Sequence, residues 1–314
     1  MDQPVRHERY ERLIAACQGL APTPTAVAHP CDESSLAGVL EAARLGLIAP
    51  ILVGPAARIR GAAKAAGLDL GNLEIVEAAH SHDSAARAVA LVREGRAEAL
   101  MKGSLHTDEL MGAVVRRETG LRTARRISHC FVMDVPGHET VLIITDAAVN
   151  IAPTLVEKVD IVQNAIDLGH ALRFPEVRVA VLSAMETVNP GVPSTIEAAA
   201  LCKMADRGQI SGAILDGPLA LDNAIDLQAA RIKKIASPVA GRANVLVVPD
   251  LEAGNMLAKS LTFLAGAVAA GIVLGARVPI ILTSRGDSEL TRLASCAVAV
   301  LVARARRESI AVVN

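Results

Sequence analysis

Residues 25–67 read TAVAHPCDESSLAGVLEAARLGLIAPILVGPAARIRGAAKAAG, and this stretch predicts the fold class. Short runs typical of β-strands alternate here with longer segments of helical composition. A capping residue, Asp32 or Ser34, can begin the first helix, and Gly46 can end it. Strands that alternate with helices favour a parallel sheet covered on both faces, which is an α/β fold. The two strands are expected at 25–28 and 51–53.

The same alternation runs through most of the chain, with one interruption. Two β runs, 127–134 and 140–145, are separated by the turn-forming residues VPGHE and predict an antiparallel hairpin. Further strands are expected at 74–76, 99–102, 177–182, 212–215, 245–248 and 280–283, and further helices at 55–67, 82–94, 108–116, 153–172, 193–207 and 287–304.

The length of 314 residues suggests two domains. The change of rhythm at the hairpin places the boundary near residue 145, and because the chain has no Pro/Ser/Gly-rich linker we expect tight crossovers between the domains. We predict α/β domain I at 1–145, completed by the C-terminal helix at 286–314, and α/β domain II at 146–285.

The composition excludes several classes of protein. Hydrophobic residues make up 52% of the chain and charged residues 21%, which excludes disordered and low-complexity proteins. The 32 Lys and Arg nearly balance the 33 Asp and Glu, so a general nucleic-acid or anionic-membrane binder is not expected. With three Phe, one Tyr and no Trp, base-stacking platforms are not expected either, and the core must consist of Ala, Val, Leu and Ile.

No stretch of the sequence predicts a membrane span or a secretory signal. The longest uncharged apolar stretch, Leu264 to Ala276, is shorter than the roughly 20 residues that a spanning helix needs. The first residues, MDQPVRHERYERL, are charged. Five cysteines, an odd number without a CxxC pair, disfavour a disulfide scaffold or a zinc ribbon. We therefore expect a cytoplasmic protein with reduced thiols and with neither a membrane nor a nucleic-acid partner.

The sharpest candidate for chemistry is LTSRGDS at 282–288, which follows a predicted strand and precedes a helix. Ligands of open α/β sheets bind at the carboxyl ends of strands, near helix N-termini. The guanidinium of Arg285 suits bidentate recognition of phosphate, and Gly286 permits close approach of the backbone. In the simpler alternative, Ser284 is a helix cap and Arg285 a surface side chain, and this motif alone does not favour phosphate recognition over that alternative.

A cluster of arginines lies in RRETGLRTARRISH, residues 116–129. It can form a docking surface for a multiply phosphorylated ligand, although a solvated charged face is the commoner fate of such runs. The balance favours a functional role for Arg125 and Arg126. Small or polar residues that fit turns and caps equally well follow other predicted strands: Asn150, Pro153, Asp216, Asp222, Asn223, Asp250, Gly254 and Asn255.

Several common fingerprints are missing from the sequence. It contains no GxSxG, Walker A or GxGxxG pattern, which argues against the usual esterases, P-loop NTPases and dinucleotide-binding enzymes. Among the eight histidines only His80 and His82 have a ligand-like spacing, in a predicted loop, so no metal site is predicted.

Seven segments in order resemble the phosphate acetyl/butyryl transferases. They are KGSLHTDEL, GLRTARRISH, ITDAAVNIAPT, AVLSAMETVNPGVPST, AALCKMADRGQISGAILDGPLALDNA, SPVAGRANVLVVPDLEAGNM and ILTSRGDS. The resemblance extends from about residue 20 to the C-terminus. It is greatest to the butyryltransferase branch and to the acyltransferase half of bifunctional enoyl-CoA hydratase/phosphate acetyltransferases. The chain has no room for a hydratase domain, so it is similar to the stand-alone transferase.

The resemblance implies a fold and a reaction. The implied fold has two α/β domains of the isocitrate/isopropylmalate dehydrogenase type with a cleft between them, in a homodimer or dimer-based oligomer. The implied reaction converts a short-chain acyl-CoA and phosphate into acyl phosphate and CoA, by direct attack in a ternary complex. Coenzyme A is a substrate there, and neither a cofactor nor a metal is implied.

The resemblance also implies roles for individual residues. Ser284 would hydrogen-bond the developing oxyanion or the sulfur, and Arg285 would hold the phosphate or the thioester oxygen. The remaining matches are assigned to substrate binding: Lys102 in KGSLHTDEL, Arg125 and Arg126 in GLRTARRISH, Asn150 and Pro153 in NIAPT, Asp216 in DGPL, and Gly254 and Asn255 in PDLEAGN.

Two positions depart from the family pattern. Acetyl-specific members carry an aspartate seven residues after the serine, where this chain has Thr291. The butyryl branch has an aspartate at the position of Asp287, which is therefore our candidate base. An arginine common after HTDEL is replaced by Gly112, so that anion binding would rest on Arg116 or Arg125, or activity would be reduced.

Two other functions are compatible with this fold. One is a non-catalytic acyl-CoA-binding regulatory module, which the Gly112 and Thr291 departures keep open. The other is a decarboxylating dehydrogenase, but no DxxxD pair of metal-binding aspartates is recognisable. The acyl chain length depends on packing and cannot be read from the sequence.

Overall fold

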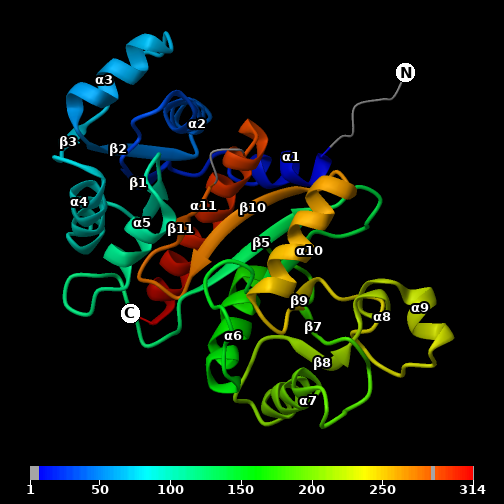
Figure 1. Ribbon diagram of the computed structural model, residues 1–314. Helices are drawn as coiled ribbons and strands as arrows, with labels where there is room; N and C mark the ends of the chain where they lie inside the picture. Colours follow the sequence, from blue (N-terminus) through cyan, green and yellow to red (C-terminus); the bar gives the residue numbers. More distant parts are fainter. Residues whose placement is uncertain (1–6, 284–286, 314) are drawn as a thin grey trace, which may run out of the picture. The chain divides into compact units, whose positions relative to one another are not determined.

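A computed structural model describes residues 7–283 and 287–313, which divide into two compact units. The terminal unit contains residues 8–125 and the chain from Ala270 onward, and the central unit contains residues 126–269 together with His7. Figure 1 shows their elements coloured along the sequence. The expected α/β class is confirmed in each unit.

The terminal unit is a mostly parallel sheet with helices packed on it. Its elements are α1 (Glu8–Ala15), β1 (Thr23–Ala28), α2 (Glu33–Arg44), β2 (Ile48–Gly54), α3 (Ala56–Ala65), β3 (Ile75–Glu77), α4 (Ser81–Arg93), β4 (Ala99–Lys102), α5 (Thr107–Val114), β10 (Val268–Leu274, which enters the unit at Ala270), β11 (Ile280–Ile281) and α11 (Glu289–Val313). The strand order is β3-β2-β1-β4-β11-β10, and only the β10–β11 pair is antiparallel.

The central unit repeats this plan with one hairpin. Its elements are β5 (Ser128–Asp134), β6 (Leu142–Thr145), α6 (Leu155–Ala171), β7 (Arg178–Leu182), α7 (Pro193–Asp206), β8 (Ile214–Leu219), α8 (Leu221–Ile225), α9 (Leu227–Ile232), β9 (Val245–Val247) and α10 (Leu251–Leu264). The strand order is β5-β6-β9-β7-β8. The predicted antiparallel hairpin is confirmed, with Cys130 opposite Thr145, and the other pairs are parallel.

The observed units and the predicted domains have different boundaries. Residues 126–145, assigned to domain I from the sequence, lie in the central unit because β6 pairs with β9. Residues 270–283, assigned to domain II, lie in the terminal unit because β11 pairs with β4. Both pairings join segments that are distant in the sequence.

The cores are aliphatic, as the composition requires. In the central unit Met133, Leu142, Ile144 and Leu246 belong to one buried cluster. All five cysteines are free thiols. Among the described helices, none combines the length and apolar character needed to cross a membrane.

Tyr10, the only tyrosine of the chain, connects α1 to the sheet of the terminal unit. Its side chain is fully buried, and its hydroxyl accepts a hydrogen bond from the backbone N–H of Ala270 at 2.6 Å. This N–H lies at the start of the part of β10 that belongs to the unit. The Tyr10 hydroxyl therefore links α1 to this strand.

We expect Tyr10→Phe to lower the free energy of unfolding by about 1–3 kcal/mol, because the buried N–H of Ala270 loses its partner. Chemical denaturation measures this loss. Glu11→Ala, at an exposed position on the same helix, is the control and should change stability by less than about 0.5 kcal/mol. Equal stability of Tyr10→Phe and the wild type would contradict the prediction.

Candidate active site

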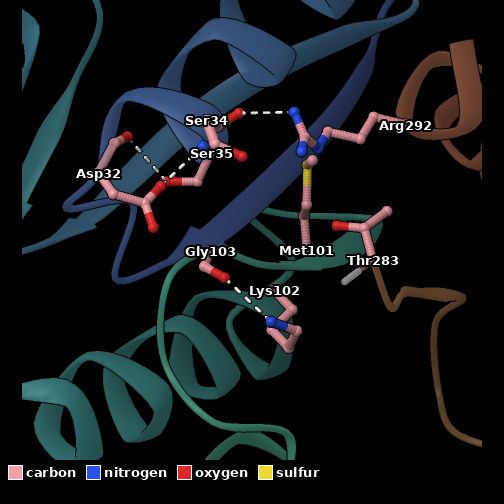
Figure 2. Close-up of a pocket in the computed structure, with 8 residues that line it drawn as sticks. All are labelled: Asp32, Ser34, Ser35, Met101, Lys102, Gly103, Thr283 and Arg292. Carbon is pink, nitrogen blue, oxygen red and sulfur yellow. Dashed lines mark hydrogen bonds between the residues drawn. The ribbon is translucent and has the colours of Figure 1, made fainter. Parts of the chain in front are cut away.

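A pocket opens in the terminal unit where the carboxyl ends of β1 and β4 meet the chain that follows β11 (Figure 2). Two cationic side chains, Lys102 and Arg292, and one carboxylate, Asp32, take part in its lining. The N-terminus of α2 also faces it, with Asp32 as the N-cap. The lining residues are Asp32, Ser34, Ser35, Met101, Lys102, Gly103, Thr283 and Arg292.

Lys102 is the predicted substrate-binding residue that lies in this pocket. Its side chain is buried, and its ammonium group donates to the carbonyl oxygens of Gly103 at 3.1 Å and Leu105 at 3.2 Å. These bonds use two of the three ammonium donors. Lys102 therefore holds the turn after β4 and places a positive charge at the carboxyl edge of the sheet.

The turn after β4 lies directly against the end of β1. The N–H groups of Gly103 and Ser104 donate to the carbonyl oxygens of Ala28 and His29, each at 2.9 Å. A Cβ atom on residue 103 would lie 2.5 Å from the Ala28 oxygen, so only glycine fits without a shift of the backbone. The Ser104 hydroxyl donates to the His29 carbonyl at 2.7 Å and accepts from the N–H of Cys31 at 3.1 Å.

His29 is buried at this junction with a left-handed backbone, φ 55°. Its Nδ1 lies 3.0 Å from the hydroxyl oxygen of Ser84, and that hydroxyl donates to the carbonyl of His80. The Ser84 oxygen therefore accepts from a protonated Nδ1. Burial, followed by the positive charge of Arg58, lowers the pKa of His29. The imidazole therefore stays neutral at neutral pH.

The sequence-predicted catalytic pair, Ser284 and Arg285, lies outside the described residues. On one side of the pair, Thr283 is buried in the pocket lining. On the other side, the half-buried Asp287 accepts a hydrogen bond at its backbone carbonyl from Arg292, at 2.7 Å.

The two departures from the family pattern have different surroundings. The Thr291 hydroxyl accepts a hydrogen bond from Ser288 at 3.1 Å, and its backbone N–H donates to the Ser288 hydroxyl at 3.2 Å, so Ser288 caps α11 and Thr291 is its partner in the first turn. Gly112 is exposed on α5, and a Cβ there would meet no atom within 4 Å. An arginine at position 112 would therefore need no change in the fold.

The central unit brings two other predicted residues together. Arg126 donates from Nε to Oδ1 of Asn150 at 2.7 Å, and its Nη1 lies 2.7 Å from the Glu157 carboxylate. Asn150 is buried, and its amide nitrogen donates to the Ile127 carbonyl at 2.9 Å and to Asp146 at 2.6 Å. Both N–H donors of the Asn150 side chain are therefore directed into the protein.

Asp146 organises the loop that carries Asn150. Its Oδ1 accepts from the N–H groups of Ala148 and Val149, and its Oδ2 accepts from the backbone and side chain of Asn150 and from the N–H of His129. The Asp146 carboxylate thus accepts five hydrogen bonds. Asp146 was not among the residues predicted from the sequence, although its place directly after a predicted strand was a signal.

The other predicted residues of this unit have structural partners of their own. Pro153 precedes Thr154, which is the N-cap of α6 in a capping box with Glu157. Asn255 donates to the carbonyl of Ala147 at 3.2 Å, and a Cβ on Gly254 would lie 2.9 Å from the Cβ of the same alanine. These contacts pack α10 against the Asp146 loop.

Two predicted residues are not joined to this group. Asp216 lies inside β8, not after the strand as expected, and accepts from the N–H of Gly217 at 2.8 Å. Arg125 belongs to the terminal unit, where its backbone N–H donates to Thr123 at 3.1 Å. No described hydrogen bond connects either residue to Asn150.

A profile described as "Phosphate acetyl/butaryl transferase" matches residues 78–300 of the chain. The chain belongs to the phosphate acetyl/butyryl transferase family. A phosphate acetyltransferase of Rhizobium meliloti is 68% identical over 97% of this chain and 96% of its own length. A phosphate butyryltransferase of Clostridium acetobutylicum is 41% identical over 88% of this chain and 92% of its own length.

Solved structures of the family agree with the fold. The crystal structure of a branched-chain phosphotransacylase from Enterococcus faecalis V583 has a TM-score of 0.78 and 29% identity to this chain. The similarity covers 90% of this chain and 99% of the other. Within residues 7–283 and 287–313, no group of three or more His, Cys, Asp or Glu is arranged to hold a metal ion.

His129, beside Asp146, generates a prediction about pH. Burial lowers the pKa of His129 to about 4, against the opposing negative charge of Asp146. The unfolded chain takes up a proton on this histidine near pH 6.5, whereas the folded chain does so only near pH 4. Stability due to the neutral imidazole is therefore complete above pH 6.5 and is lost as the pH falls toward 4.

When the pH is lowered from about 7.5 to about 5, we expect protonation of this histidine to lower the free energy of unfolding by about 2 kcal/mol. The His129→Asn variant should lose about 2 kcal/mol less over the same interval, measured as the change in the free energy of unfolding by urea. All other residues are the same in the two proteins, so their contributions cancel in the comparison. Parallel losses in the two proteins would contradict the prediction.

Proposed function

We propose that this protein is a phosphate acyltransferase that converts a short-chain acyl-CoA and inorganic phosphate into acyl phosphate and CoA. Family membership over most of the chain carries this proposal. Acetyl-CoA is the first substrate to test, because the Rhizobium meliloti relative is named phosphate acetyltransferase. Butyryl-CoA is the second, because the Clostridium acetobutylicum relative is named phosphate butyryltransferase.

The reaction needs charge stabilisation and the positioning of two anionic reactants. A phosphate oxygen attacks the thioester carbonyl carbon, the carbon–sulfur bond breaks, and the electron pair leaves with the CoA sulfur. Ser284 is proposed to donate to the developing oxyanion or to the sulfur, and Arg285 to hold the phosphate or the thioester oxygen. Asp287 is proposed to exchange the thiol proton, and Lys102 adds a positive charge at the same sheet edge.

The substrate-binding roles of Arg125, Arg126, Asn150, Pro153, Asp216, Gly254 and Asn255 stay predictions. For Asn150 and Arg126 the contacts favour a positioning role. Both side-chain donors of Asn150 bind groups of the protein, and Arg126 pairs with Glu157 and Asn150. A ligand would have to compete with these partners.

Three further expectations also stay predictions. They are the isocitrate/isopropylmalate dehydrogenase-like cleft, the homodimer or dimer-based oligomer, and the cytoplasmic location. Light scattering coupled to gel filtration tests the oligomer.

A thiol-release assay with acetyl-, propionyl- and butyryl-CoA tests the function. We expect CoA release that depends on phosphate and proceeds without added metal. Release with one of the three substrates defines the acyl preference. A folded protein that releases no CoA from any of them, but binds acyl-CoA in calorimetry, would instead be the regulatory module.

Substitutions at the proposed catalytic pair test the site. Ser284→Ala should lower kcat by about 10²–10³ with little change in KM, because the lost donor acts only in the transition state. Arg285→Lys should lower kcat and also raise the KM for phosphate, because an ammonium group lacks the planar fork. Steady-state kinetics of both variants and of the double variant should give less than additive effects. Wild-type kinetics for both single variants would mean that the pair serves only as a helix cap and has no catalytic role.

A further inference from the structure

Arg292 connects two helices of the terminal unit through backbone carbonyl groups. Its Nη1 donates to the carbonyl of Ser34 in the first turn of α2, at 3.1 Å, as Figure 2 shows. Its Nη2 donates to the carbonyl of Asp287, just before α11, at 2.7 Å. The peptide group of Asp287 is thereby fixed to α2.

Gly38 makes room for this side chain. Ser34 and Gly38 are four residues apart on α2 and share one helix face. A Cβ atom on Gly38 would lie 2.8 Å from Cδ of Arg292, and the three atoms nearest to it all belong to Arg292. The arginine stem therefore occupies the space of a side chain at position 38, and its head reaches the carbonyl one turn earlier.

Glycine inside a helix is normally unfavourable relative to alanine. Gly38 lies in the middle of α2 and is buried, so an alanine there would add helix propensity and apolar contact. The contact with Arg292 is the feature of the described structure that this alanine would disturb. A second helix-interior glycine, Gly61 in α3, has no atom within 4 Å of its ideal Cβ and offers a matched control.

We infer that Arg292, seated on Gly38, is a positioning residue that sets the direction of the Asp287 carboxylate. The inference rests on the proposed function, in which Asp287 exchanges the thiol proton. Fixing the carbonyl of residue 287 restricts its backbone torsions and so the direction of its side chain. A displacement of about 1 Å at a reacting group can cost about 10²-fold in rate. The planar guanidinium serves two carbonyl groups at once, which a lysine cannot do in the same way.

Steady-state kinetics of Gly38→Ala, Arg292→Met and Arg292→Lys test the inference. We expect Gly38→Ala and Arg292→Met to lower kcat by about tenfold or more, with KM values for acyl-CoA and phosphate within about twofold of the wild type. Arg292→Lys should lose less, because one of the two carbonyl groups keeps a donor. Gly61→Ala should leave the kinetics unchanged and raise the Tm. Unchanged kcat in all three test variants would overturn the inference.

A double-mutant cycle with Asp287→Asn separates positioning from general damage. If Arg292 acts through the carboxylate, Gly38→Ala and Arg292→Met should each cost less than about twofold in the Asp287→Asn background. An equal cost in both backgrounds would mean a structural role only and would overturn the inference. If Gly38→Ala does not fold, the two Arg292 variants complete the same cycle.

Assays of the wild type distinguish a failure of this inference from a failure of the proposed function. An inactive wild type with every acyl-CoA tested refutes the function, and the positioning role with it. An active wild type whose Asp287→Asn variant keeps full kcat supports the function and overturns the positioning role alone.

Discussion

The close contact between the turn after β4 and the end of β1 is the constraint on which the pocket depends. Because residue 103 has no side chain, two backbone N–H groups reach the carbonyl oxygens of Ala28 and His29. The contact aligns the carboxyl ends of two parallel strands and places Lys102 opposite the cap of α2. A buried lysine that also bonds the carbonyl groups of this turn makes the edge rigid.

The sequence predicted most of the fold because its strands and helices alternate and carry local signals. Asp32 or Ser34 was expected to cap α2, and it is the Asp32 carboxylate that accepts from the N–H of Ser35, at 2.8 Å. The VPGHE turn correctly indicated the antiparallel hairpin. The strand β10 was missed because its residues, VAAGIVL, are rich in alanine and buried over most of their length, so they show no alternation of polar and apolar residues.

The unit boundaries could not be predicted because they depend on pairing between distant segments. The short strand β11 pairs with β4, which lies almost two hundred residues earlier and supplies the register Ile280 to Leu100. A two-residue strand carries no local signal for such a partner. Tyr10 is similar, because nothing in the sequence of α1 indicates a hydrogen bond to Ala270.

The candidate site was predictable only where residues follow strands or match family motifs. Lys102, Asn150 and Asp287 were selected in this way, and their roles stay predictions. Arg292 and Gly38 were not, since their importance arises from tertiary contacts, and Asp146 was passed over although it follows a predicted strand. The five hydrogen bonds that Asp146 accepts explain why an aspartate stands there. The side chain of Arg292, which packs against Gly38, explains the glycine. The only advance signal for Gly38 was a glycine inside a predicted helix.

The carboxylate proposed to exchange the thiol proton, Asp287, precedes α11, whereas the family's acetyl-specific pattern has its aspartate inside this helix. The resemblance implies an aspartate at position 291 in acetyl-specific members, but here Thr291 stands in the first turn of α11 and is hydrogen-bonded to the capping residue Ser288. Thr291 lies within α11, whereas Asp287 precedes the helix and its carbonyl accepts a hydrogen bond from Arg292 of the same helix. If Asp287 exchanges the thiol proton as proposed, its carboxylate lacks the rigidity that a place inside the helix would supply. In the inference above, Arg292 of α11 supplies that restraint by binding the carbonyl groups of Asp287 and of Ser34 in α2, and Gly38 leaves room for its side chain.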